Sequence, residues 1–224
     1  MIRLSVVAVI LSFLSACGPT KLENSFNFDS TNENSLLVVY DSGENKANKI
    51  IFVQTDLANS QFKDETETFL LCPASCGGMT NYNTFKLQQG PASYFAKVIP
   101  PGQYSPLAKW WRNMIARVRT CYSKGSYVFD FKPGTINLVN LNRLTGSTAM
   151  ARQNLALILN TYPNINGDIV TTKPVAKIAF EEAEEKSFGE PCFPETGGQP
   201  IEILKRFDIY QIEARDSRSP DNIN

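Results

Sequence analysis

The chain contains no histidine among its 224 residues. That absence excludes Ser-His-Asp and Cys-His catalysis, histidine-ligated zinc and a histidine proton shuttle. The sequence also lacks a Gly-rich phosphate-binding loop and a cluster of metal-ligand residues at a recognisable spacing. We therefore expect no catalytic residue, no metal and no cofactor, and we favour a protein that binds over an enzyme.

The chain has no excess of either charge and no long apolar run. Lys and Arg together number 22, as do Asp and Glu, so we expect no basic surface that would bind nucleic acid. No run reaches the roughly 20 apolar residues that a membrane-spanning helix needs. With 42% hydrophobic and 11% aromatic residues, the chain can still build a packed core, which excludes a disordered protein.

A short apolar leader begins the chain. Arg3 is its one positive charge, residues 4–14 are apolar apart from two serines, and Ser15 and Ala16 are small. A charged start, an apolar centre and small residues at the end are typical of a secretory signal. An uncleaved N-terminal anchor, or chance apolar residues ahead of a soluble domain, are the alternatives that these three features disfavour.

The leader ends in Leu14-Ser15-Ala16-Cys17. This run resembles the lipobox of bacterial lipoproteins, in which the cysteine is acylated and becomes the first residue of the mature protein. The resemblance implies that the signal peptide, residues 1–16, is removed and that Cys17 anchors the protein to a membrane. Gly18 follows, where Gram-negative lipoproteins retained in the inner membrane usually carry aspartate. The resemblance therefore implies an outer-membrane lipoprotein, on the periplasmic face or at the cell surface.

Four cysteines remain after Cys17, namely Cys72, Cys76, Cys121 and Cys192. An even number in an exported chain indicates two disulfides, for which three connectivities exist. A zinc site made of all four is the competing interpretation, but such a site usually shows two close pairs and this chain has one. We favour Cys72–Cys76, in a Gly-rich loop, together with Cys121–Cys192.

The composition divides the mature chain into three parts. Residues 17–34 are polar and predict a flexible tether, in which Phe26 and Phe28 are candidates for docking on the domain. Residues 35–213 carry the apolar segments of one domain. Residues 214–224 form a polar tail.

The domain is predicted to be mainly β. Apolar or alternating segments separated by turn residues predict strands at 35–40, 49–55, 93–99, 104–111, 127–131, 136–141, 175–180 and 207–213. The first two are expected to form a hairpin or to lie side by side. Residues 148–160 predict the one helix, which Tyr162-Pro163 would end. Together these elements predict an antiparallel β-sandwich with one peripheral helix.

Two Pro-Gly turns punctuate the strands. The first is Pro100-Pro101-Gly102 with Tyr104 after it, and the second is Lys132-Pro133-Gly134, three residues after Phe129. With the apolar strand that follows, and with the segment 151–174, this order resembles envelope lipoproteins that carry a carboxypeptidase-regulatory or prealbumin-like β-sandwich. The resemblance implies the fold and leaves the function open.

Trp110 and Trp111 are the candidate partner-binding residues. Adjacent residues of a strand point to opposite faces, so we expect one indole in the core and the other on the surface. The favoured function is a lipid-anchored binding or scaffolding module with a protein partner in the cell envelope. A surface-exposed adhesin-like module is the alternative, and a histidine-free hydrolase with paired carboxylates is a third hypothesis.

Overall fold

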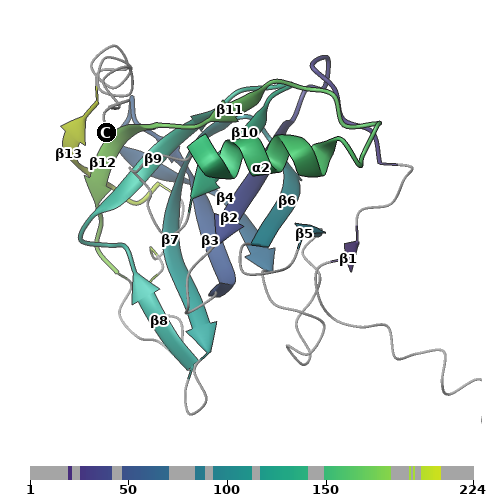
Figure 1. Cartoon of the computed structure of the whole chain (residues 1–224). Coiled ribbons are helices and arrows are strands. Elements are labelled where there is room, and N and C mark those ends of the chain that lie inside the picture. Colours follow the sequence, from purple (N-terminus) through teal and green to yellow (C-terminus); the bar gives the residue numbers. More distant parts are fainter. Residues whose placement is uncertain are drawn as a thin grey trace, which may run out of the picture.

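The computed structural model contains two β-sheets packed face to face and, among the residues it describes, one helix (Figure 1). Those residues are 20–21, 26–41, 47–70, 84–88, 93–112, 117–140, 149–182, 192, 194 and 198–207. The predicted mainly β, sandwich-like fold with one peripheral helix is confirmed. Cys17, Cys72 and Cys76, the leader and the tail lie outside the described residues.

The first sheet has six strands and mixes parallel with antiparallel pairs. In spatial order its strands are β1 (Thr20–Lys21), β5 (Phe85–Gln88), β6 (Ser93–Ile99), β2 (Ser35–Asp41), β10 (Ile136–Asn140) and β11 (Ile169–Thr171). The pairs β5–β6 and β6–β2 are antiparallel. The pairs β1–β5, β2–β10 and β10–β11 are parallel, which the expectation of an antiparallel sandwich did not include.

The second sheet is antiparallel throughout. In spatial order its strands are β13 (Glu202–Arg206), β12 (Pro174–Ala179), β9 (Ser126–Phe131), β7 (Gly102–Arg112), β3 (Ala47–Asp56) and β4 (Gln61–Leu70), with β8 (Arg117–Cys121) paired to the far part of β7. Residues 208–213, expected in the last strand, lie outside the described residues, and β13 ends at Arg206.

The expected pairing of the first two strands is wrong. β2 lies in the first sheet between β6 and β10, whereas β3 lies in the second sheet between β7 and β4. Both strands are nearly continuous apolar runs, because each is a central strand that is covered on both faces. A run of that kind has no alternation from which its partner could be read.

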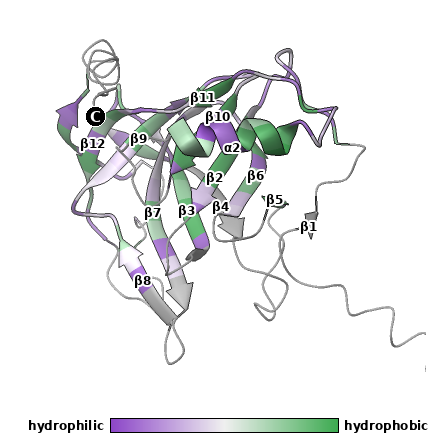
Figure 2. Ribbon diagram, in the orientation of Figure 1, coloured by the Kyte–Doolittle hydropathy of each residue, from purple (hydrophilic) through white to green (hydrophobic). Residues whose placement is uncertain are grey.

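The main core lies between the two sheets. The residues buried there are Leu37, Val39, Ile50, Phe52, Phe95, Ile99, Tyr104, Phe129, Phe131 and Val139. Successive residues of β2 point to opposite faces, so Leu36 and Val38 lie in a second cluster on the outer face of the first sheet. Figure 2 shows apolar residues along the middle of β3 and at both ends of the helix.

The helix α2 (Ala149–Leu159) covers the outer face of the first sheet, as the segment 148–160 predicted. Ala151, Leu155 and Leu159 are four residues apart and form its buried stripe. The Tyr94 hydroxyl donates a hydrogen bond to the Ala151 carbonyl at 3.1 Å, which joins the start of α2 to β6.

The N-terminal segment 26–34 packs on the same face as α2. Phe28 is 1% exposed and lies between residues of the loop after the helix. Its N–H donates to the Asn164 carbonyl at 3.0 Å, and its carbonyl accepts from Asn166 at 2.7 Å. The Phe26 ring lies 5.1 Å from the ring of Phe85. Both candidate docking residues within the expected tether therefore contact the domain.

The first Pro-Gly turn is bonded to the buried tyrosine that follows it. Tyr104 is fully buried, and its hydroxyl donates to the Pro100 carbonyl at 3.1 Å. Gly102 has a φ of +145°, and a Cβ there would lie 2.6 Å from the Gln54 Nε2 of the neighbouring β3. The motif thus closes the β6–β7 connection against the core, as a buried tyrosine bonded to upstream backbone does in other sandwiches.

The second Pro-Gly turn contacts the N-terminal segment directly. Gly134 has a φ of +66°, and a Cβ there would lie 2.2 Å from the Ser30 carbonyl oxygen. Its N–H donates to the Asn34 carbonyl at 2.9 Å, and the Ser35 hydroxyl donates to the Lys132 carbonyl at 2.5 Å. The turn therefore fixes the chain immediately before β2.

We predict that Gly134→Ala destabilises the protein more than Gly198→Ala. Gly198 also has a positive φ, +80°, but nothing lies within 4 Å of its missing Cβ. Its substitution should cost only the backbone term of about 1 kcal/mol. Gly134→Ala adds the collision with Ser30 and should cost about 2–4 kcal/mol. Urea unfolding measures both, and equal losses would contradict the proposed contact.

Candidate functional site

The disulfide Cys121–Cys192 joins the end of β8 to the C-terminal part of the chain. The two Cα atoms are 5.3 Å apart, and Cys192 is fully buried. This pairing is the one that the sequence analysis favoured for Cys121. The pairing of Cys72 with Cys76 lies outside the described residues and stays a prediction.

The disulfide belongs to a third apolar cluster, on the outer face of the second sheet. Phe180, Cys192 and Ile201 cover that face, and the rings of Phe62 and Phe180 meet edge to face at 5.1 Å. The Phe180 N–H donates to the Ser123 carbonyl at 2.9 Å, and the Ser123 hydroxyl donates to the Glu182 carboxylate. The turn after β8 is therefore joined to the covering segment by two hydrogen bonds besides the disulfide.

Trp110 lies on the same outer face, beside the disulfide. Its half-buried ring packs against the third cluster, as does Cys121. The Lys49 Nζ lies 4.9 Å from the ring centroid. The strand register places Lys49 of β3, Trp110 of β7 and Arg119 of β8 in one row, and residues in register share a face. We call Lys49, Trp110, Arg119 and Cys121 the Trp110 surface.

The structure describes the side chain of only one of the two candidate tryptophans, Trp110. The half-buried Trp110 ring packs against the third cluster, and the strand register places it between Lys49 and Arg119. For Trp111 the structure describes only the strand backbone, which pairs with Ala47 and Val118. The structure thus brings Trp110, Cys121 and Cys192 to one face, although Cys192 is 71 residues after Cys121 in the sequence.

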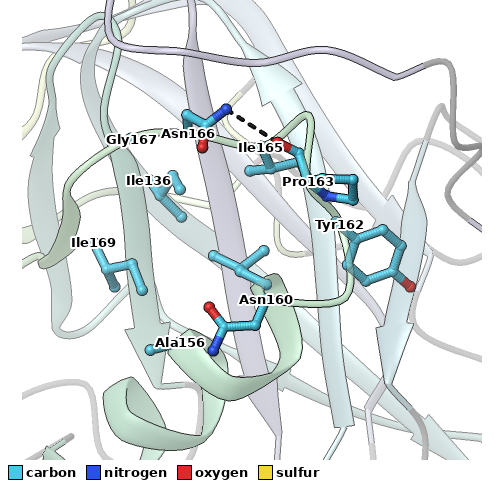
Figure 3. A pocket seen from close by; sticks show the side chains of 10 residues that line it. Ile136, Ala156, Asn160, Tyr162, Pro163, Ile165, Asn166, Gly167 and Ile169 are labelled. Atoms are coloured by element: carbon cyan, nitrogen blue, oxygen red, sulfur yellow. Dashed lines mark hydrogen bonds between the residues drawn. The ribbon is translucent and has the colours of Figure 1, made fainter.

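A concave site that the sequence did not indicate lies at the end of α2. Its volume is about 350 Å³, and it opens between the helix, β10 and β11 (Figure 3). Ile136, Ile165 and Ile169 form apolar walls, and Asn160 and Asn166 supply amides. The Asn166 amide already donates to the Pro163 carbonyl at 3.1 Å. The site fits an apolar side chain or a small neutral group, and no sequence motif marks it.

Tyr122 is the one described residue whose pKa is moved far from its ordinary value. Burial raises the pKa of its phenol to about 12, and the Asp41 carboxylate adds to the rise. Its N–H donates to the Leu107 carbonyl at 2.9 Å. A group that holds its proton so firmly acts as a neutral structural contact at neutral pH.

The described residues contain no group of three or more His, Cys, Asp or Glu side chains placed to hold a metal ion. Within the same part of the chain, no helix has both the length and the apolar character to cross a membrane. In comparisons with protein-family models, curated proteins and solved structures, nothing matches this chain.

We predict that removing the disulfide by Cys121→Ala with Cys192→Ala lowers the free energy of unfolding by about 4 kcal/mol. The bridge closes a span of 71 residues, and the chain-entropy model gives about that value for such a loop. The matched variant Cys72→Ala with Cys76→Ala should lose only about 2 kcal/mol, because its loop is short. Thiol titration of the denatured, unreduced protein should find no free thiol, and four reactive thiols would refute both bridges.

We predict that stability falls between about pH 10 and pH 12 because of Tyr122. The unfolded phenol loses its proton near pH 10, whereas the folded one keeps it to about pH 12. The folded state then binds more protons, so the free energy of unfolding falls by up to about 2 kcal/mol across that range. Tyr122→Phe should show a shallower decline in urea unfolding. Parallel curves for the two proteins would contradict the assignment.

Proposed function

We propose that this protein is a lipid-anchored protein of the bacterial cell envelope that acts by binding a partner protein and not by catalysis. The observation that carries the proposal is the sequence Leu14-Ser15-Ala16-Cys17 at the end of a short apolar leader. A thiol at that place, with small residues before it, suits acylation and cleavage. Two or three acyl chains give stable anchoring, at about 0.8 kcal/mol per buried methylene.

The Trp110 surface supports the binding part of the proposal. An indole that projects from a paired strand and packs against the third cluster loses little conformational freedom when a partner covers it. The strand register places Lys49 and Arg119 on either side of it, so the surface combines an aromatic ring with basic side chains. The surface belongs to the rigid second sheet, which favours recognition without rearrangement.

The chemistry of the chain supports binding over catalysis. Histidine, the commonest acid–base residue near neutral pH, is absent from the whole sequence. The recognisable motifs are two turns, and the structure gives both a packing role through Tyr104 and Gly134. A sandwich with such turns offers loops, strand edges and rigid faces as binding surfaces.

The anchor is tested by Cys17→Ser. The wild-type protein should incorporate labelled fatty acid, fractionate with membranes and have an intact mass that lacks residues 1–16. Cys17→Ser should lose the label and the membrane association. Label retained by the variant, or Met1 retained in the wild-type mass, would overturn the anchor.

The binding surface is tested by crosslinking in intact cells, followed by identification of the captured protein. Trp110→Ala should weaken capture at least about tenfold, as truncation of a central aromatic anchor does. Leu204→Ala is the matched control, because Leu204 is another exposed apolar residue of the second sheet, 43% exposed on β13, and it should leave capture unchanged. Circular dichroism would verify that both variants fold.

Turnover of an envelope substrate by the purified domain, lost on changing one carboxylate, would overturn the proposal.

A further inference from the structure

The chain is held by the first sheet almost immediately after Cys17. Thr20 and Lys21 form β1, which pairs in parallel with β5, and the register places Thr20 opposite Phe85 and Lys21 opposite Lys86. Only Gly18 and Pro19 stand between Cys17 and β1. Beyond β1, Phe26 contacts Phe85 and Phe28 is buried, so the chain returns to the domain twice more before β2.

This pairing limits how far the domain can stand from an anchor at Cys17. Three residue steps span at most about 11 Å when fully extended. A free tether from Cys17 to Asn34 would instead reach about 60 Å. A folded domain of this size has a radius of gyration of about 16 Å. The reach is shorter than that radius, so the edge that carries β1 has to lie at the membrane surface.

We infer that the acylated protein stands on the lipid surface on its β1–β5 edge, with no free tether between anchor and domain. The inference rests on the proposed acylation of Cys17 and adds an orientation to it. The β1–β5 edge contacts the bilayer in which the acyl chains are embedded, because the connection from Cys17 to β1 is too short to hold the edge away from the lipid.

The residues at this edge suit a lipid headgroup region. The paired rings of Phe26 and Phe85 are half-buried there, and aromatic rings are common at the membrane–water boundary. Lys86 follows Phe85 on β5, opposite Lys21 on β1. A lysine near an anionic lipid surface contributes about 1 kcal/mol of attraction.

The same orientation places β13 on the side of the molecule away from the membrane. β4 of the second sheet contacts β6, so the β4 edge lies on the side of the anchor. β13 is at the opposite edge of that sheet, five strand spacings or about 24 Å from β4. Lys205 on β13 should therefore remain in water while Lys86 is shielded.

Chemical labelling of lysine side chains on the vesicle-bound protein tests this orientation. The full-length, lipidated protein is placed in vesicles of phosphatidylcholine and phosphatidylglycerol, whose headgroups carry no primary amine, and is treated with an amine-reactive ester. The modified lysines are then quantified by mass spectrometry. Soluble Cys17→Ser at the same concentration is the reference. A third protein carries about 20 Gly and Ser residues inserted after Gly18, which restores a reach of about 25 Å.

We expect modification of Lys86 to slow several-fold in the vesicle-bound protein and to recover in the insertion variant, while Lys205 reacts equally in all three. Equal reactivity of Lys86 in the anchored and soluble proteins, with acylation of Cys17 verified by intact mass, would overturn the orientation and leave the anchor standing. Absence of the acyl chains would overturn both. Protection of Lys86 in soluble Cys17→Ser that is lost on dilution would also overturn the inference, and would assign the edge to a second copy of the chain.

Discussion

Burial of the first sheet on both faces is the constraint on which the rest of the structure depends. In β2, Leu37 and Val39 point into the space between the sheets, and Leu36 and Val38 point to the helix side. All four are fully buried. At about 1.5–3 kcal/mol for each buried side chain, this strand alone contributes about 6–12 kcal/mol, which equals the whole net stability of a typical domain. Neither face can be left open to water, so α2 and the N-terminal segment are needed to complete the sheet.

The second sheet meets the same requirement by a different means. Its outer face carries Ile51, Val53 and Leu107, and Phe180, Cys192 and Ile201 pack against them there. The disulfide and the two hydrogen bonds of Ser123 hold these covering residues in place. Trp110 lies on this face only half-buried, so its side chain packs against the domain and is also open to the partner that we propose.

The sequence predicted the elements better than their arrangement. Residues 93–99 match β6, and the helix 148–160 differs from α2 by one residue at each end, because a turn, an alternating pattern or a stop signal marks each of them locally. β4 was not expected, since its charged sequence lacks an apolar alternation; such charges are typical of an edge strand. The parallel pairing of Leu36 with Ile136 is also invisible in the sequence, because register between distant strands depends on how both faces of the sheet are covered. Of the candidate site, the sequence indicated Trp110 and the two bridged cysteines, but not that Lys49 of β3 lies over the Trp110 ring.

The N-terminal segment connects this construction to the proposed function. A polar composition predicts a tether, and the composition of 17–34 is polar; the structure nevertheless places Phe28 under the loop after α2 and Ser30 against Gly134. These two contacts outweigh the polar composition of the segment, because each one fixes the neighbouring backbone as well. The segment that would join the lipid to the domain is thus also the segment that completes the helix side of the first sheet. On the proposed anchoring at Cys17, a change that loosened this segment would alter both the packing of β2 and the distance of the domain from the membrane, so anchoring and folding would depend on the same few residues.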